Sequence, residues 1–135
     1  MSDPASVIVV GWTPDQYGEV ALVRGVEEAR LREGRVVVVN ATRGDALVDA
    51  RYADEDQLAR LATELAGSGV DVDVRRSMGA DVGDQVLAVA LDVAADLIVI
   101  GLRKRSPVGK LLMGSVAQRI LLGAECAVLA VKPQG

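Results

Sequence analysis

The sequence contains no histidine and a single cysteine, Cys126, among its 135 residues. These absences exclude histidine general-base catalysis, Cys-His nucleophile pairs, zinc sites and disulfides within the chain. Aromatic residues make up 2% of the chain and phenylalanine is missing, so the core has to be built from Val, Leu, Ile and Ala. We expect Cys126 to be a small buried hydrophobe, because no partner thiol or nearby positive charge activates it.

No apolar run approaches the roughly 20 residues that a membrane-spanning helix needs, and Met1 to Ala5 lack the basic start of a secretory signal. We therefore expect a cytoplasmic protein that does not bind membranes. The 15 basic and 19 acidic residues give a formal net charge of -4, which disfavours affinity for nucleic acid. The charge is uneven, because the stretch from Leu97 to Ala124 has five basic and no acidic residues: Arg103, Lys104, Arg105, Lys110 and Arg119.

The length of 135 residues predicts one domain spanning the whole chain, 1–135. Continuous aliphatic runs predict buried strands, and alternation of valine with aspartate predicts a half-exposed strand nearer the sheet edge. The buried strands are expected at 7–10, 36–39, 97–100 and 127–131, and the half-exposed strand at 70–74. Apolar residues at helical spacing predict helices between them, near 13–34, 54–67, 81–93 and 114–122.

The alternation of strands and helices predicts an α/β fold, with one doubly wound, Rossmann-like parallel sheet and helices on both faces. In such sheets, ligands bind beyond the carboxyl ends of the strands, at the point where the strand order reverses. The segments that follow Val10, Val39 and Ile100 are therefore the places to look for a site.

The segment from Gly101 to Val116 is the most informative part of the sequence. A glycine ends a strand, a basic loop follows, and Gly114-Ser115 begins a helix whose free amides and dipole favour an anion. This order of features predicts a phosphate site. Its expected members are the glycines Gly101 and Gly114, the cations Arg103, Lys104 and Lys110, and Ser115 and Val116 at the helix start. The alternative is a flexible loop of solvated charges before an N-cap serine.

Two common nucleotide-binding signatures are missing. Gly109-Lys110 has no Ser or Thr after it and does not directly follow a strand, so it is not a P-loop. Gly11 does not begin a Gly-x-Gly-x-x-Gly turn, because Thr13 stands where the second glycine belongs.

Over nearly its whole length, the sequence resembles the universal stress protein family. The most specific part of the resemblance is the family's nucleotide motif: Gly, two residues, Gly, nine residues, Gly, then Ser or Thr. Gly101, Gly114 and Ser115 match this motif in register, and Lys104 stands at the second glycine position.

The resemblance implies a five-stranded parallel sheet in the order 3-2-1-4-5 and a homodimer joined through the last strand. In one subgroup it also implies ATP bound across the carboxyl ends of strands one and four. That subgroup usually has an Asp after strand one, where this chain has Gly11-Trp12, and its adenine packs near the position of Asn40-Ala41. Trp12 either stacks on the base or covers the sheet edge.

The first functional reading is a dimeric stress-response regulator that binds an adenine nucleotide such as ATP, or another phosphate-bearing ligand. It is not expected to be an enzyme, since no general base or nucleophile converges on the loop and we name no catalytic or metal-binding residue. The second reading is a stress-response dimer without a physiological nucleotide, which docks an acidic protein partner through Arg103–Lys110. A third, slow ATP hydrolysis, needs a metal that the loop has no carboxylate to hold.

Overall fold

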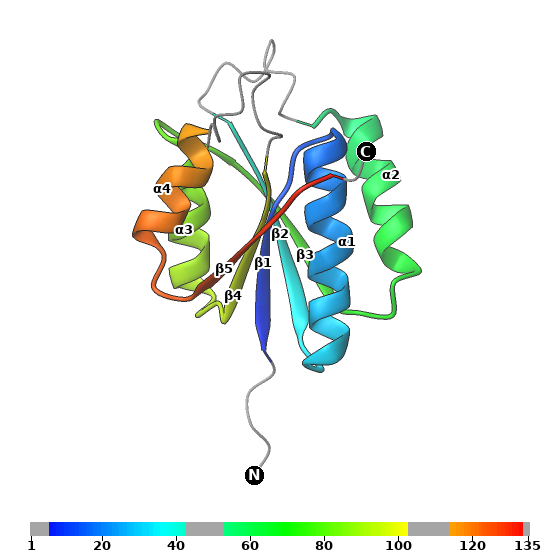
Figure 1. The fold of residues 1–135 in the computed structure, drawn as a ribbon. Coiled ribbons are helices and arrows are strands. Elements are labelled where there is room, and N and C mark those ends of the chain that lie inside the picture. The colour runs from blue at the N-terminus through cyan, green and yellow to red at the C-terminus, as the bar shows by residue number, and fades with distance from the viewer. Residues whose placement is uncertain (1–5, 43–52, 103–113, 134–135) are drawn as a thin grey trace.

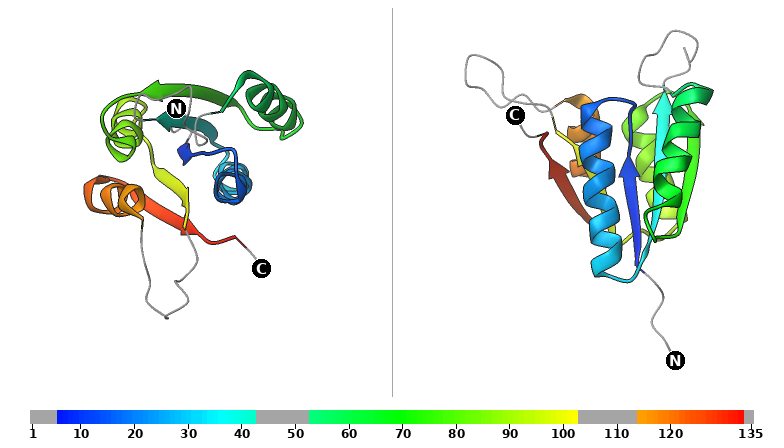
Figure 2. Two further views of the ribbon diagram at one scale, coloured as in Figure 1. Left: turned by 90° about the horizontal axis from the view of Figure 1, so that it is seen from above. Right: turned by 90° about the vertical axis from the view of Figure 1, so that its right-hand side faces the viewer.

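The computed structural model describes residues 6–42, 53–102 and 114–133. Five parallel strands form one sheet in the order β3-β2-β1-β4-β5. The strands are β1 (Val7–Gly11), β2 (Arg35–Thr42), β3 (Val72–Met78), β4 (Leu97–Gly101) and β5 (Ala127–Val131). The helices within the described ranges are α1 (Gln16–Leu31), α2 (Glu55–Ala66), α3 (Val82–Asp92) and α4 (Ser115–Gly123). The first two helices cover one face of the sheet and the last two cover the other (Figures 1 and 2), which confirms the doubly wound α/β prediction.

Two strands run beyond their predicted ends at the same place in the sheet, and β3 also begins two residues later than predicted. β2 runs on to Thr42 instead of ending at Val39, and β3 spans Val72–Met78 instead of 70–74. The two strands pair in register as far as Thr42 and Met78. Asn40 and Thr42 are both fully buried, so these polar residues continue the strand, although the sequence pattern predicted its end before them.

Aspartates begin three of the four helices in the described part. At α1 the Asp15 carboxylate accepts from the Tyr17 and Gly18 amides (3.0 Å each). Asp54 forms a capping box with Gln57 at α2, and Asp81 accepts from the Asp84 amide (2.8 Å) at α3. Such caps satisfy amides that a helix leaves without partners. The N-cap of α4 is Gly114, with no side-chain hydrogen bond.

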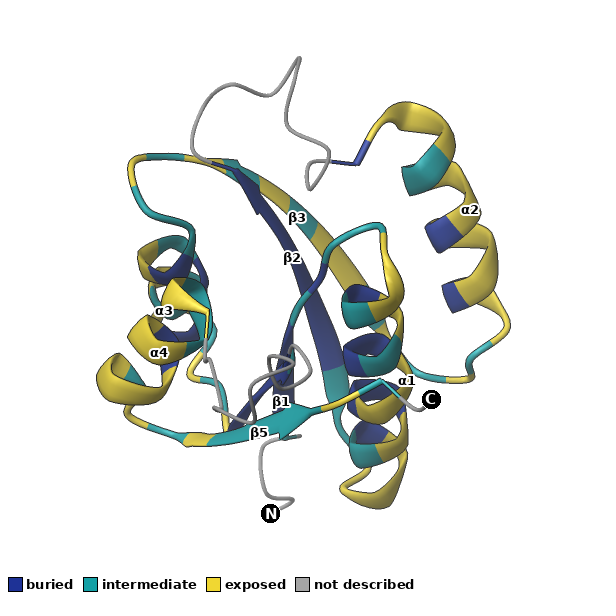
Figure 3. Ribbon diagram, turned by 45° about the horizontal axis from the view of Figure 1, so that its top comes forward, coloured by how far each residue is buried: buried dark blue, intermediate teal, exposed yellow. Residues whose placement is uncertain are grey.

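The core has two apolar layers, one on each side of the sheet. β1, β2 and β4 are buried along most of their length, whereas β3 and β5 are half-buried or exposed (Figure 3). Cys126 was predicted to be a small buried hydrophobe; it is half-buried and packs against the apolar layer beneath α3 and α4. Burial raises the pKa of its thiol. None of the described helices combines the length and apolar character that crossing a membrane requires.

Candidate functional site

The carboxyl ends of β1 and β4 meet at one edge of the sheet, where Gly11 pairs with Ile100. The N-terminus of α4 lies at the same edge, at the top of Figure 1. Gly11 and Gly101 end β1 and β4 at this edge, Trp12 directly follows β1, and Gly114, Ser115 and Val116 form the start of α4. Ala41 lies near the end of the neighbouring strand β2 and is buried, with 5% of its surface exposed. Arg103, Lys104 and Lys110 lie outside the described residues.

The N-terminus of α4 has the features expected of an anion site. Gly114 has φ -61° and ψ 153°, a conformation open to any residue, and a Cβ built on it meets no heavy atom within 4 Å. Within the described ranges, neither backbone conformation nor packing therefore requires glycine here. Ser115 is exposed and is the first helical residue, so the alternative of an N-cap serine is wrong. In the described part of the chain no side chain caps the first amides of α4, and free amides at a helix start favour an anion.

Gly101 has a different reason to be glycine. A Cβ on Gly101 would lie 2.3 Å from the Tyr17 carbonyl oxygen, in the first turn of α1. Because backbone cannot yield as a flexible side chain can, any larger residue at this position would push α1 away from β4. The packing of α1 thus explains this glycine without a phosphate, which is not the reason that the sequence suggested.

Trp12 is part of the core beneath α1 and α2, with 6% of its surface exposed. Its amide donates to the Val39 carbonyl (2.9 Å), which fixes the chain as it leaves β1. The ring is therefore not the exposed platform that base stacking requires, and the packing alternative fits its burial. Its indole Nε1 is buried and has no hydrogen-bond partner among the described residues.

Asn40, a buried residue that was not predicted as a member of the site, connects the segments at this edge of the sheet. The Asn40 side-chain amide donates to the Trp12 carbonyl (3.0 Å), and its Oδ1 accepts from the Ala53 amide (2.8 Å). The Ala53 carbonyl in turn accepts from the Arg76 guanidinium (2.8 Å). These bonds tie the exits of β1 and β2 to the segment that enters α2. The signal in the sequence was one polar residue directly after four valines, since a polar residue in a buried strand needs partners.

Of the five basic residues between Leu97 and Ala124, Arg119 is the one in the described part of the chain, and it has a structural partner. Its Nε lies 2.7 Å from the Asp84 carboxylate on α3, and this hydrogen bond raises the pKa of Arg119. This ion pair joins α3 to α4 on the surface. Because the charge of Arg119 is already balanced by Asp84, Arg119 is not expected to neutralise a phosphate. No cluster of three or more His, Cys, Asp or Glu side chains suited to a metal occurs in residues 6–42, 53–102 and 114–133.

The sheet order and the helices on both faces define a protein of the Rossmann-like α/β class. The model of the universal stress protein family matches residues 5–132. A curated universal stress protein from Mycolicibacterium smegmatis is 46% identical over 129 residues, which cover 96% of this chain and 99% of that protein. The chain belongs to the universal stress protein family, as its sequence predicted.

Solved structures of the family share the fold. A universal stress protein from Archaeoglobus fulgidus has 30% sequence identity and a TM-score of 0.79, over 96% of this chain and all of that chain. A universal stress protein from the same organism in complex with dAMP has 26% identity and a TM-score of 0.69, over 95% of this chain and 98% of that one.

Proposed function

We propose that this protein is a dimeric regulator of the stress response, not an enzyme, and that it binds an adenine nucleotide such as ATP. The observation that carries the proposal is the N-terminus of α4. There Gly114, with no atom of the described residues within 4 Å of an added Cβ, stands in place of the aspartate that caps α1, α2 and α3. The Archaeoglobus fulgidus relative that holds dAMP supports an adenine nucleotide as the ligand.

In this proposal the amides of Ser115 and Val116 and the Ser115 hydroxyl bind the phosphates, and the Gly114 backbone approaches them closely. Arg103 and Lys104 neutralise the charge. The nucleoside lies along the ends of β1 and β2, near Gly11, Trp12 and Ala41. Because the Trp12 ring is buried, this residue contributes through its backbone, which Asn40 and Val39 hold in place.

The proposed dimer uses the outer edge of β5. Ala127 is exposed and Val128–Val131 are half-buried in the single chain, and the strand carries no charged residue. An apolar strand with a free edge favours pairing with another strand. A second copy pairing with β5 would cover this edge, and the closed twofold arrangement is the commonest in homo-oligomers.

Calorimetric titration with ATP and with AMP tests the nucleotide site. We expect the wild type to bind, and Gly114→Val to reduce the affinity at least about tenfold, since its side chain enters the space that a phosphate needs. Gly67→Val is the matched control, because Gly67 caps the far end of α2 and its Cβ would meet only the Glu64 carbonyl, at 3.8 Å. Equal binding by Gly114→Val and Gly67→Val would locate the site elsewhere.

Lys104→Gly separates two roles for the residue at the second glycine position of the motif. If Lys104 adds a charge contact, the change to glycine weakens binding or leaves it little altered, and this is the result we expect. If glycine is needed there for close approach of the backbone, Lys104→Gly creates or strengthens ATP binding. A wild type that binds no nucleotide, beside a Lys104→Gly variant that does, would contradict the proposed function.

A further inference from the structure

β3 forms one edge of the sheet, because it pairs with β2 and with no other strand in the described part of the chain. The Asp71 carbonyl accepts from the Val36 amide of β2 (2.9 Å). At the other end, the Gly79 amide donates to the Thr42 carbonyl of β2 (3.0 Å). The odd-numbered residues thus turn their backbone groups toward β2. Because backbone directions alternate along a strand, the outward amides and carbonyls are those of Val72, Val74, Arg76 and Met78.

The side chains of β3 divide by chemistry between the two faces of the sheet. Val72 packs against the core beneath α1 and α2, and Val74 lies on the same face by alternation. Asp73 and Arg75 lie on the other face. There the Arg75 guanidinium reaches Asp73 (3.1 Å) and Asp92 of α3 (3.0 Å). One face of this edge therefore carries Val72 and Val74 followed by Arg76, whose guanidinium bonds the Ala53 carbonyl. The other face carries an acid followed by a base.

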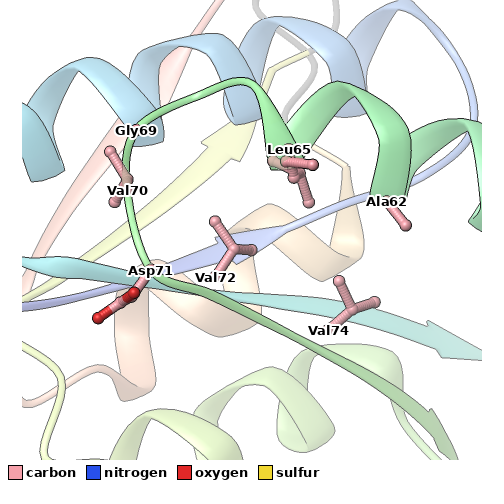
Figure 4. A pocket seen from close by; sticks show the side chains of 8 residues that line it. Ala62, Leu65, Gly69, Val70, Asp71, Val72 and Val74 are labelled. Atoms are coloured by element: carbon pink, nitrogen blue, oxygen red, sulfur yellow. The ribbon is translucent and has the colours of Figure 1, made fainter.

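An open groove of about 370 Å³ runs between α2 and the apolar face of β3 (Figure 4). Val72 and Val74 point into it from β3, and Ala62 and Leu65 line it from α2. Val74 keeps 36% of its surface exposed there. An unpaired strand edge beside exposed apolar side chains is a template for a further strand.

We propose that a second copy of this chain occupies this edge, through antiparallel pairing of β3 with β3 about a twofold axis at Val74. Val74 then lies opposite Val74 of the second copy, and their outward backbone groups form the hydrogen-bonded pair. Asp73 lies opposite Arg75 of the second copy, and the symmetry repeats this contact. These charges occupy non-hydrogen-bonded positions, where side chains across a ladder are closest and opposite charges stabilise the pairing.

The order of charges along β3 selects this register. Moving the twofold axis to Asp73 would place the two Asp73 carboxylates directly opposite each other. Moving it to Arg75 would do the same for the two guanidinium groups, and like charges in such positions destabilise a sheet. A slip of one strand by a single residue would set the valines of one copy against the charged face of the other. Pairing about Val74 thus places opposite charges together on one face. On the other face it sets Val74 against Val74 and Arg76 against Val72 of the second copy, with Val74 of each copy covering part of the other copy's groove.

Cross-linking at position 74 tests this contact without depending on nucleotide binding or on β5. The test protein carries Val74→Cys with Cys126→Ser, and is treated with a short thiol-to-thiol cross-linker at micromolar concentration. We expect a covalent dimer. Val23→Cys in the same Cys126→Ser background is the matched control, since Val23 is an exposed valine (48%) on α1. It should give at least about tenfold less cross-linked dimer, because no pairing holds two copies together at α1.

Charge reversal then tests the register. All variants carry Asp92→Asn, so that a carboxylate introduced at position 75 does not face Asp92. Asp73→Arg alone and Arg75→Asp alone should each lower the cross-linked yield about tenfold, because each sets like charges opposite one another. The combined Asp73→Arg and Arg75→Asp variant should restore the yield, since the swapped pair is again complementary. Circular dichroism of each variant confirms that it is folded.

Two results would overturn the proposal. One is a yield at position 74 no higher than that of the Val23→Cys control. The other is a cross-linked yield that is the same in all the charge variants, which would indicate random collision and not pairing in one register. Failure of either kind leaves the proposed nucleotide site unaffected, because that site lies at the carboxyl ends of β1 and β4 and is measured by titration.

Discussion

Asn40 is the residue that holds the ends of β1 and β2 to the segment that enters α2. It is fully buried, and its side chain bonds both the Trp12 carbonyl and the Ala53 amide. A polar group inside an apolar layer is stable only while such bonds are made. The geometry of the sheet edge therefore depends on a residue that need not touch the ligand.

Asn40→Ala should lower the free energy of unfolding by about 2 to 4 kcal/mol, because it leaves the Trp12 carbonyl and the Ala53 amide buried without partners. Denaturation by urea, followed by circular dichroism, measures this change. The control is Thr63→Ala, on the exposed face of α2, where the hydroxyl bonds only the Ala59 carbonyl of its own helix. A loss from Asn40→Ala no larger than that from Thr63→Ala would mean that water replaces the bonds at little cost.

Glu19 on α1 and Glu64 on α2 form a pair of acids between the two helices. Burial raises the pKa of Glu19 most, and a hydrogen bond to Glu64 and repulsion from its charge raise it further. A carboxyl whose pKa is higher in the folded than in the unfolded chain stabilises the fold at low pH. That contribution is lost as the pH rises through the folded-state pKa.

Glu64→Gln should therefore stabilise the protein at pH 7, where it removes the repulsion. The gain should be small, about 0.5 kcal/mol, since the pair is largely exposed to solvent. At pH 4, near the ordinary pKa of about 4.3 for glutamate, the gain should vanish. Thermal unfolding at both values of pH measures it. A gain of equal size at pH 4 and pH 7 would show that charge is not its cause.

The strands differ in how well the sequence could predict them, and the reason is burial. β1, β4 and β5 match the predicted runs within one residue, because continuous aliphatic residues are typical of strands in a parallel sheet. β3 lies at the edge, where Arg75 and Arg76 are tolerated. Its true end depends on pairing with β2 and not on its own pattern.

The candidate site was predictable where one short segment carries the signal and not where distant segments meet. The glycine and serine at the start of α4 could be recognised from their order along the chain. Three features of this region depend on residues that are far apart in the sequence: the burial of Trp12, the hydrogen bonds of Asn40 and the ion pair of Arg119 with Asp84. No local pattern indicates which of these side chains find a partner.

The start of α2 was predicted near residue 54, but its capping box was not predicted. The Asp54 carboxylate accepts from the Gln57 amide (2.8 Å), and the Gln57 side chain accepts from the Asp54 amide (2.9 Å). Asp54→Ala should cost about 1 kcal/mol. Amide hydrogen exchange should quicken in the first turn of α2 and much less in β1. An equal increase throughout the protein would mean that α2 does not open separately from the core.

The two edges of the sheet differ in chemistry, and this difference bears on how whole molecules associate. β5 has five apolar residues and no charge, whereas β3 alternates valines with an aspartate and an arginine before Arg76. Charged side chains on an edge strand restrict which strands can pair with it. We therefore expect β5 to form the tighter contact and β3 the weaker, more register-dependent one. Twofold contacts at both edges would join dimers into larger assemblies.

A proline at the outer edge of β5 tests the proposed dimer. The Val131 carbonyl accepts from the Leu102 amide, which follows β4 (2.7 Å), so by alternation the backbone groups of Ala130 face outward. Ala130→Pro removes an amide that β4 does not use, and edge positions of this kind tolerate proline. Sedimentation equilibrium at micromolar concentration should give a dimer or larger assembly for the wild type. Ala130→Pro should lose the β5 contact while remaining folded.

Val74→Pro is the matched variant at the opposite edge, since the Val74 amide also faces outward. It should leave the β5 dimer intact and abolish only association through β3. A wild type that sediments as a monomer would contradict the dimer through β5. A dimer that survives Ala130→Pro and disappears with Val74→Pro would move the principal contact to β3, and would reverse the order of strength that the charges on the two edges predict.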